Sequence, residues 1–162
     1  MKLLTLIVAI AYIIYTIVCW WKNDKKYVDS LSATHYLWKN KYVFPTVISC
    51  LGFGLLPCWL EAMEGSDWQA LAFFSCVNLI LIGTSPDYRN DKRQYKTHMW
   101  CAYSAAALSL IVLIFVTDGW FFFPIFFCLG CFGDMFYFEK NIVYHLEDAL
   151  ILSVFFSVLW NN

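Results

Sequence analysis

The sequence predicts an all-α integral membrane protein, a single domain (residues 1–162) built as a bundle of six transmembrane helices. The first observation is composition: 61% of the residues are apolar, 14% are charged and the mean hydropathy is +0.61. Soluble domains carry about 25% charged residues, so this chain has too few charges for a water-facing surface. The second is that the charges cluster and leave long apolar stretches. The third is the distribution of the tryptophan, lysine and arginine residues along the chain.

The six apolar stretches are each long enough to cross a hydrocarbon core of roughly 30 Å at about 1.5 Å per residue. The first follows a single lysine, as a secretory signal would, but it is too long and lacks a small-x-small cleavage site. The second contains Pro45 and Pro57, which membrane helices tolerate when neighbours satisfy the backbone. We expect spans at residues 3–21, 42–60, 68–84, 98–117, 120–138 and 142–160.

The connections differ in length. Residues 22–41 are long enough to include a short helix lying on the membrane surface. A short acidic turn separates the second and third spans, and the polar segment 85–97 precedes the fourth. Asp118 and Gly119 form a tight turn, and residues 139–141 join the last two spans. Small side chains at 102–109 predict that another helix backbone approaches the fourth span closely.

Tryptophan and cationic side chains support this assignment independently. All eight tryptophans lie at or beside a predicted span end, where aromatic belts form: Trp20, Trp21, Trp38, Trp59, Trp68, Trp100, Trp120 and Trp160. Ten of the eleven Lys and Arg residues fall in the first, third and fifth connections, and only Lys2 lies on the other side. The positive-inside rule therefore predicts that connections 22–41, 85–97 and 139–141 are cytoplasmic and that both termini face outward across an inner membrane.

The seven cysteines lie in apolar stretches, where we interpret them as small buried side chains. Cys128 and Cys131 have the C-x-x-C spacing of thiol oxidoreductases, but no cysteine falls in an outer connection to act with them, and a redox role is left open. A net charge of −1 and the absence of a basic tail give no indication of a nucleic-acid partner.

Ionisable side chains at membrane depth are costly and are functional candidates by default. Asp134 in the fifth span and Asp148 in the sixth each lie about seven residues from the connection between them, at a similar depth. His145 and Asp148 share a helix face, whereas Glu147 points about 100° away from Asp148. Ser85, Asp87 and His98 come from other segments at the same membrane side.

Three interpretations of this cluster are open. His98, His145 and Asp148 are candidate ligands of a divalent metal such as zinc, with Ser85, Asp87, Asp134 and Glu147 as catalytic candidates around a metal-bound water. The carboxylates could instead share a proton, since close carboxylates do not all stay ionised in a low dielectric. The third interpretation is structural, with the same groups joining helices by hydrogen bonds.

A pattern of six residues resembles that of uncharacterised small bacterial polytopic membrane proteins: Ser30, Ser32, Tyr36, Pro86, His98 and Glu147. This resemblance implies a fold but no activity. A more distant similarity, carried by Ser85, Asp87, His98 and His145, is to ceramidase and haemolysin-III-like intramembrane hydrolases. That similarity implies zinc chemistry, although those families have seven spans and three zinc-binding histidines, and this chain has no His-x-x-x-His pair.

Three functions follow as hypotheses. The first is a non-catalytic membrane component, such as a partner subunit or an assembly or immunity factor, bound to another membrane protein or to copies of itself. The second is a metal-assisted hydrolase or other lipid-modifying enzyme with its site in the cytoplasmic leaflet. The third is an oligomeric pore, which would need a continuous polar stripe across the bilayer.

Overall fold

A computed structural model describes residues 1–24, 26–117, 119–137 and 141–161, with residues 133–137 described by their backbone alone. These residues form six α-helices and two 3₁₀ segments and contain no strand, which confirms the predicted all-α class. The elements are α1 (Lys2–Lys22), η1 (Leu31–Leu37), α2 (Val43–Ala62), α3 (Gln69–Thr84), α4 (Lys92–Phe115), η2 (Gly119–Phe121), α5 (Phe122–Tyr137) and α6 (Ile142–Asn161).

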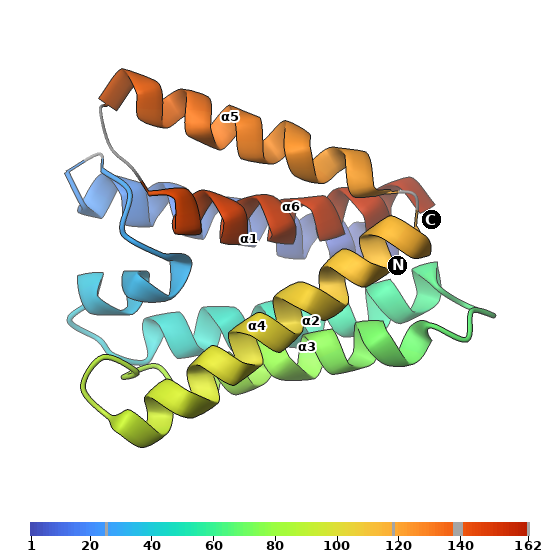
Figure 1. The fold of residues 1–162 in the computed structure, drawn as a ribbon, viewed down its shortest axis with the longest axis horizontal. Helices are drawn as coiled ribbons and strands as arrows, with labels where there is room; N and C mark the ends of the chain where they lie inside the picture. The colour runs from blue at the N-terminus through green and yellow to red at the C-terminus, as the bar shows by residue number, and fades with distance from the viewer. Residues whose placement is uncertain (25, 118, 138–140, 162) are drawn as a thin grey trace.

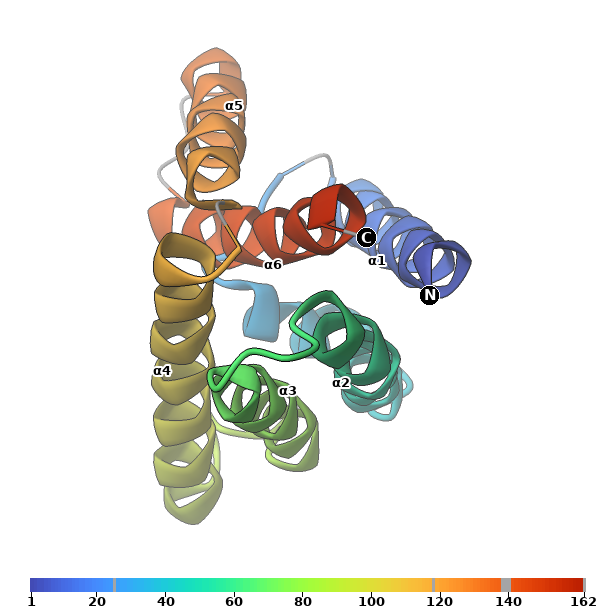
Figure 2. The same cartoon turned by 90° about the vertical axis from the view of Figure 1, so that its right-hand side faces the viewer.

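The helices run roughly lengthwise as a bundle in which both termini lie at one end (Figure 1). α2 contacts α1, α3 and α6, and α6 also contacts α1 and α4. α5 lies on the outside of the bundle, against α6 and η2 (Figure 2). η1 and the α3–α4 connection (85–91) lie at the end opposite the termini.

Four of these helices, α1, α2, α4 and α6, are long and apolar enough to cross a membrane. They make the chain a candidate multi-span membrane protein and support the coarse prediction. α3 has only 16 residues, about 24 Å at 1.5 Å per residue, and the apolar part of α5 is similarly short. The six-span count therefore stays a prediction as far as α3 and α5 are concerned.

Two local predictions differ from the structure. α4 begins at Lys92 rather than at His98, because the Asp91 carboxylate accepts a hydrogen bond from the Arg93 N–H at 2.8 Å and caps the helix. The short helix expected on the membrane surface is η1, and residues 31–35 of it are buried inside the end of the bundle. The sequence pattern missed this burial because η1 lies within residues 22–41, which carry several charges on both sides of it.

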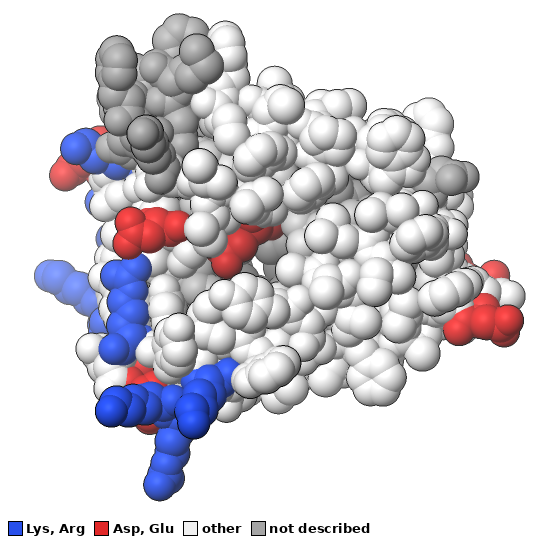
Figure 3. Space-filling model, viewed as in Figure 1, with Lys and Arg blue, Asp and Glu red and all other residues white. Residues whose placement is uncertain are grey.

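Charge separates along the bundle. Lys and Arg side chains gather at the end that holds η1 and the α3–α4 connection, while the acidic α2–α3 turn lies at the opposite end (Figure 3). The N-terminal ammonium is 3.2 Å from Glu61 in the last turn of α2, beside that connection. The sequence predicts that the connections rich in Lys and Arg lie at one end of the bundle, and the described side chains of these connections do so. Lys25 and Lys140 lie outside the described residues.

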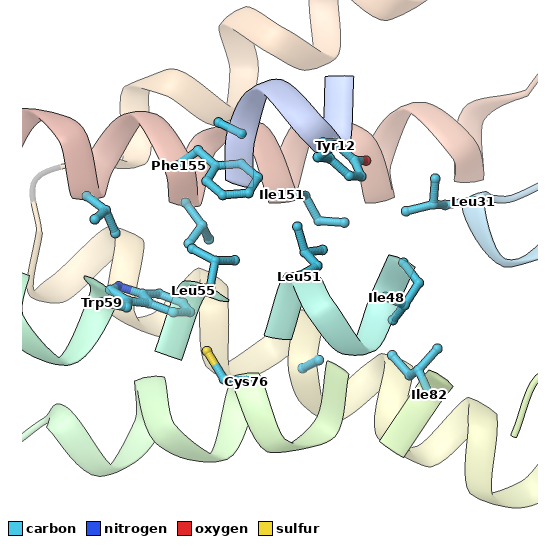
Figure 4. Close-up of a cluster of buried hydrophobic side chains, with 14 of the residues drawn as sticks. Tyr12, Leu31, Ile48, Leu51, Leu55, Trp59, Cys76, Ile82, Ile151 and Phe155 are labelled. Atoms are coloured by element: carbon cyan, nitrogen blue, oxygen red, sulfur yellow. The ribbon is translucent and has the colours of Figure 1, made fainter. Parts of the chain in front are cut away.

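The core lies between α2 and α6. Leu51 and Leu55 of α2 point toward Ile151 and Phe155 of α6 (Figure 4), and all four are at least nine-tenths buried. On its other side α2 packs closely on α3 at Gly52, where a Cβ would lie 2.7 Å from Ile80 Cγ1 and 3.0 Å from the Cys76 carbonyl oxygen.

The small-residue surface predicted on the fourth span packs against α3. The Ser75 hydroxyl of α3 lies 2.7 Å from the Ser109 hydroxyl of α4 and donates to the Ala105 carbonyl oxygen at 3.1 Å. Small side chains let the two helices come close enough for these bonds. At this position the surface is therefore used within the chain itself.

We expect Gly52→Leu to destabilise the bundle by about 1–3 kcal/mol, because the added side chain must displace α3. Thermal unfolding of the detergent-purified protein measures the effect. Phe53→Ala, at a neighbouring position of α2 that is 63% exposed, is the matched control and should change stability little. Equal melting temperatures for Gly52→Leu and the wild type would contradict the close α2–α3 packing.

Candidate functional site

The candidate site is built around η1. Ser30 starts this segment, since its hydroxyl accepts a hydrogen bond from the Ala33 N–H at 3.2 Å while its own backbone is extended. The segment ends at Trp38, where the backbone becomes extended again. The first five residues of η1 are buried, so their polar groups need partners inside the protein.

Hydrogen bonds from two membrane helices hold η1 in place. The Glu147 carboxylate of α6 accepts the Leu31 N–H at 2.6 Å. The Tyr15 hydroxyl of α1 lies 2.6 Å from the Thr34 hydroxyl, which itself donates to the Leu31 carbonyl oxygen. A hydrogen bond to a carboxylate is stronger than one between two neutral groups, so Glu147 is a main anchor of η1.

His98 of α4 is buried and bonded through both ring nitrogens. Its Nδ1 is 2.9 Å from the Ser85 carbonyl oxygen and its Nε2 is 2.9 Å from the Ser32 hydroxyl. A carbonyl oxygen only accepts, so Nδ1 carries the proton and, in the neutral ring, Nε2 accepts the proton of Ser32. The Tyr88 ring stacks on the imidazole with centroids 4.3 Å apart and fixes its plane.

A cavity of about 80 Å³ opens beside Ser32, between η1, α2, α3, α4 and α6. Its lining is apolar apart from Ser32, Ser109, Glu147 and the indole of Trp59. The Trp59 N–H is buried and has no hydrogen-bond partner among the described residues. The lining residues of α2 extend from Phe44 to Trp59, roughly 22 Å along the helix, so the cavity is long and narrow.

The remaining predicted residues are dispersed. Ser85 contributes its backbone carbonyl to His98, and Asp87 accepts from the Asn90 amide at 2.7 Å and from the Tyr36 hydroxyl at 3.4 Å. Asp148 accepts from the Tyr12 hydroxyl of α1 at 2.6 Å. Asp87 and Asp148 therefore bond to different elements, and the two ring nitrogens of His98 bond to neither.

His145 lies elsewhere on α6, where it packs against Gly130 of α5. A Cβ at Gly130 would lie 2.6 Å from the His145 Nδ1, and the Tyr27 ring centroid is 4.7 Å from that of His145. The side chain of Asp134 lies outside the described residues. Within the described part of the chain, no group of three His, Cys, Asp or Glu residues is close enough to hold a metal ion. The metal set therefore stays a hypothesis.

Sequence reasoning identified His98 and Glu147 but did not select their partners. Ser32 was part of the Ser-x-Ser pattern, yet only the fold brings its hydroxyl to His98, which is 66 residues away. Tyr12 and Tyr15 lie in an apolar span and carry no signal of a polar role.

Comparison with known proteins adds no assignment. No protein family, no curated protein and no solved structure matches this chain. The two resemblances drawn from the sequence therefore stay predictions.

We expect Glu147→Leu to release η1, because the buried Leu31 N–H loses its acceptor, while Glu147→Gln keeps a carbonyl oxygen there. Hydrogen exchange of the amides at residues 31–37 should rise roughly tenfold in Glu147→Leu, in line with the 1–3 kcal/mol lost with one buried hydrogen bond. Exchange in Glu147→Gln should stay close to that of the wild type. Unchanged exchange in both variants would show that Glu147 does not anchor η1.

Proposed function

We propose that this chain is a six-span protein of the inner membrane whose connections 22–41, 85–97 and 139–141 face the cytoplasm. Support comes from the gathering of cationic side chains at the end of the bundle that holds η1 and the α3–α4 connection. The short helices α3 and α5 are compatible with six spans, because local thinning of the bilayer or long flanking side chains can accommodate a short membrane helix.

Reporter fusions test this orientation. Alkaline phosphatase fused after Asn161 should be active, because the C-terminus then faces outward, and green fluorescent protein at the same position should stay dark. Fusions after Asn90 should give the reverse pattern, since three spans precede that residue. Bright green fluorescence from the C-terminal fusion would contradict the proposed orientation.

We further propose that the chain is a lipid-modifying hydrolase or acyltransferase, with Ser32 as nucleophile and His98 as general base. The single observation that carries this proposal is the bond from the Ser32 hydroxyl to the His98 Nε2, with the opposite ring nitrogen held by the Ser85 carbonyl. A hydroxyl next to a base that a third group orients is the arrangement of nucleophilic catalysis. Ser85 is then a positioning residue through its backbone.

The chemistry requires two steps. Ser32 Oγ attacks the carbonyl carbon of an ester or amide while His98 Nε2 takes the hydroxyl proton, and the imidazolium returns that proton to the leaving group. Water, or the hydroxyl of an acceptor, then attacks the acyl-serine and gives its proton to His98. The acyl product leaves, and both side chains regain their starting protonation states.

The cavity indicates the substrate class. It lies beside Ser32, is almost entirely apolar and extends along the bundle axis. A linear hydrocarbon matches this shape and polarity better than a sugar or a peptide does. We therefore favour a substrate with an acyl chain that enters from the membrane, with its carbonyl carbon at Ser32.

A fluorophosphonate probe with an alkyl tail should label the wild-type protein at Ser32. Ser32→Ala should abolish labelling, and His98→Ala should slow it by about 10²–10⁴-fold, the usual contribution of a general base. Ser104→Ala, which removes a serine hydroxyl from α4 outside the cavity lining, is the matched control, and labelling of that variant should persist. Mass spectrometry locates the adduct, and thermal unfolding checks that each variant is folded. Absence of labelling in the folded wild type would contradict the enzymatic proposal.

A non-catalytic membrane component is the second candidate, and a specific observation favours it. The bonds of Glu147, Asp148 and His98 all lie within the chain and join η1, α1, α4 and α6, as structural contacts would. α5 contacts only α6 and η2 among the described elements and leaves Ile125, Leu129 and Phe132 exposed. These side chains would meet either lipid or a partner subunit. Site-specific crosslinking from Leu129 in native membranes distinguishes the two neighbours.

A further inference from the structure

A second hollow, distinct from the apolar cavity, lies on the outer side of η1 at the cationic end of the bundle. It is a cleft of about 750 Å³ between the segment that joins η1 to α2 and the segment that joins α3 to α4. Its polar lining includes Lys39, Lys41, Asn90 and Gln94, together with the ring of His35. Nothing in the proposed acyl chemistry uses this cleft.

His35 points to a ligand in the cleft. The residue is 3% exposed, and its Nδ1 has no hydrogen-bond partner among the described residues. Burial lowers the pKa of His35, and the Lys41 ammonium lowers it further, whereas Asp87 raises it by a smaller amount. The lowered pKa favours the neutral ring. A buried polar atom without a partner is costly, and a polar group bound in the cleft would supply one.

The charge around the cleft favours an anion. Lys39 and Lys41 are both exposed, and neither forms an ion pair with a described residue. The one carboxylate of the lining, Asp87, is already bonded to the Asn90 amide and the Tyr36 hydroxyl. α2 also starts here, at Val43, so the positive end of its dipole adds to the two ammonium groups.

The position of the cleft further restricts the chemical class of its ligand. It lies where α2 begins and α3 ends, and Tyr42 at its edge is 77% exposed, as expected of an aromatic side chain at a membrane–water boundary. Lipid phosphates lie at this level. We propose that the cleft binds the phosphate of an anionic ligand, either a lipid headgroup or a soluble phosphate ester, through Lys39, Lys41 and the His35 imidazole.

Native mass spectrometry of the detergent-purified full chain tests the proposal with three probes: dioctanoyl phosphatidylglycerol, dioctanoyl phosphatidylcholine and inorganic phosphate. The wild type should bind phosphatidylglycerol in preference to phosphatidylcholine. In Lys39→Gln/Lys41→Gln this affinity should fall about thirtyfold, from about 1 kcal/mol for each ammonium near a membrane surface. Because both lysine side chains are exposed, their replacement should leave the fold intact, and thermal unfolding checks this.

The matched control is Lys92→Gln/Lys96→Gln, which removes the same charge from an exposed part of α4 outside the cleft. This variant should keep the wild-type affinity within about threefold. Displacement of phosphatidylglycerol by inorganic phosphate would identify a soluble phosphate ester as the ligand source, and its failure would identify a lipid headgroup. Equal affinity in Lys39→Gln/Lys41→Gln and the wild type, or equal binding of both lipids, would overturn the proposal. Labelling of Ser32 is a separate readout, so the two proposals fail independently.

Discussion

The structure depends on the satisfaction of polar groups in an apolar interior. η1 brings backbone N–H groups and hydroxyl side chains into the buried end of the bundle, where they would be costly among hydrocarbon side chains without partners. Glu147 accepts the Leu31 N–H, Tyr15 meets Thr34 and His98 meets Ser32. These bonds come from α6, α1 and α4, so the position of one short segment fixes three helices relative to one another.

The same constraint creates both candidate sites. Because η1 lies across the end of the bundle, it separates an apolar cavity on its inner side from a cationic cleft on its outer side. Ser32 faces the first and His35 the second, although they are three residues apart. A lipid at this boundary would present its acyl chains and its phosphate to the two sides, so the two sites are compatible with one class of amphipathic ligand.

Polar residues of the predicted cluster fall into two groups for a geometric reason. His98 and Glu147 approach η1, whereas Asp148 turns to Tyr12 and His145 to the Tyr27 ring. Residues of one helix that are one to three positions apart can face different neighbours when that helix is surrounded, as α6 is by α1, α2, α4 and α5. Depth along the membrane, the quantity that the sequence predicts, does not decide which neighbour each side chain meets.

The sequence by itself determined the fold class, the approximate helix positions and the polarity of the bundle, because hydropathy and charge act over whole segments. Local signals limited its accuracy: the Asp91 cap extends α4, and the charges that flank residues 31–37 concealed the burial of this segment. Only the tertiary structure paired Ser32 with His98 and placed His35 in a cleft. Those pairings depend on contacts between residues far apart in the chain, and a hydroxyl or imidazole has no partner until the helices are packed.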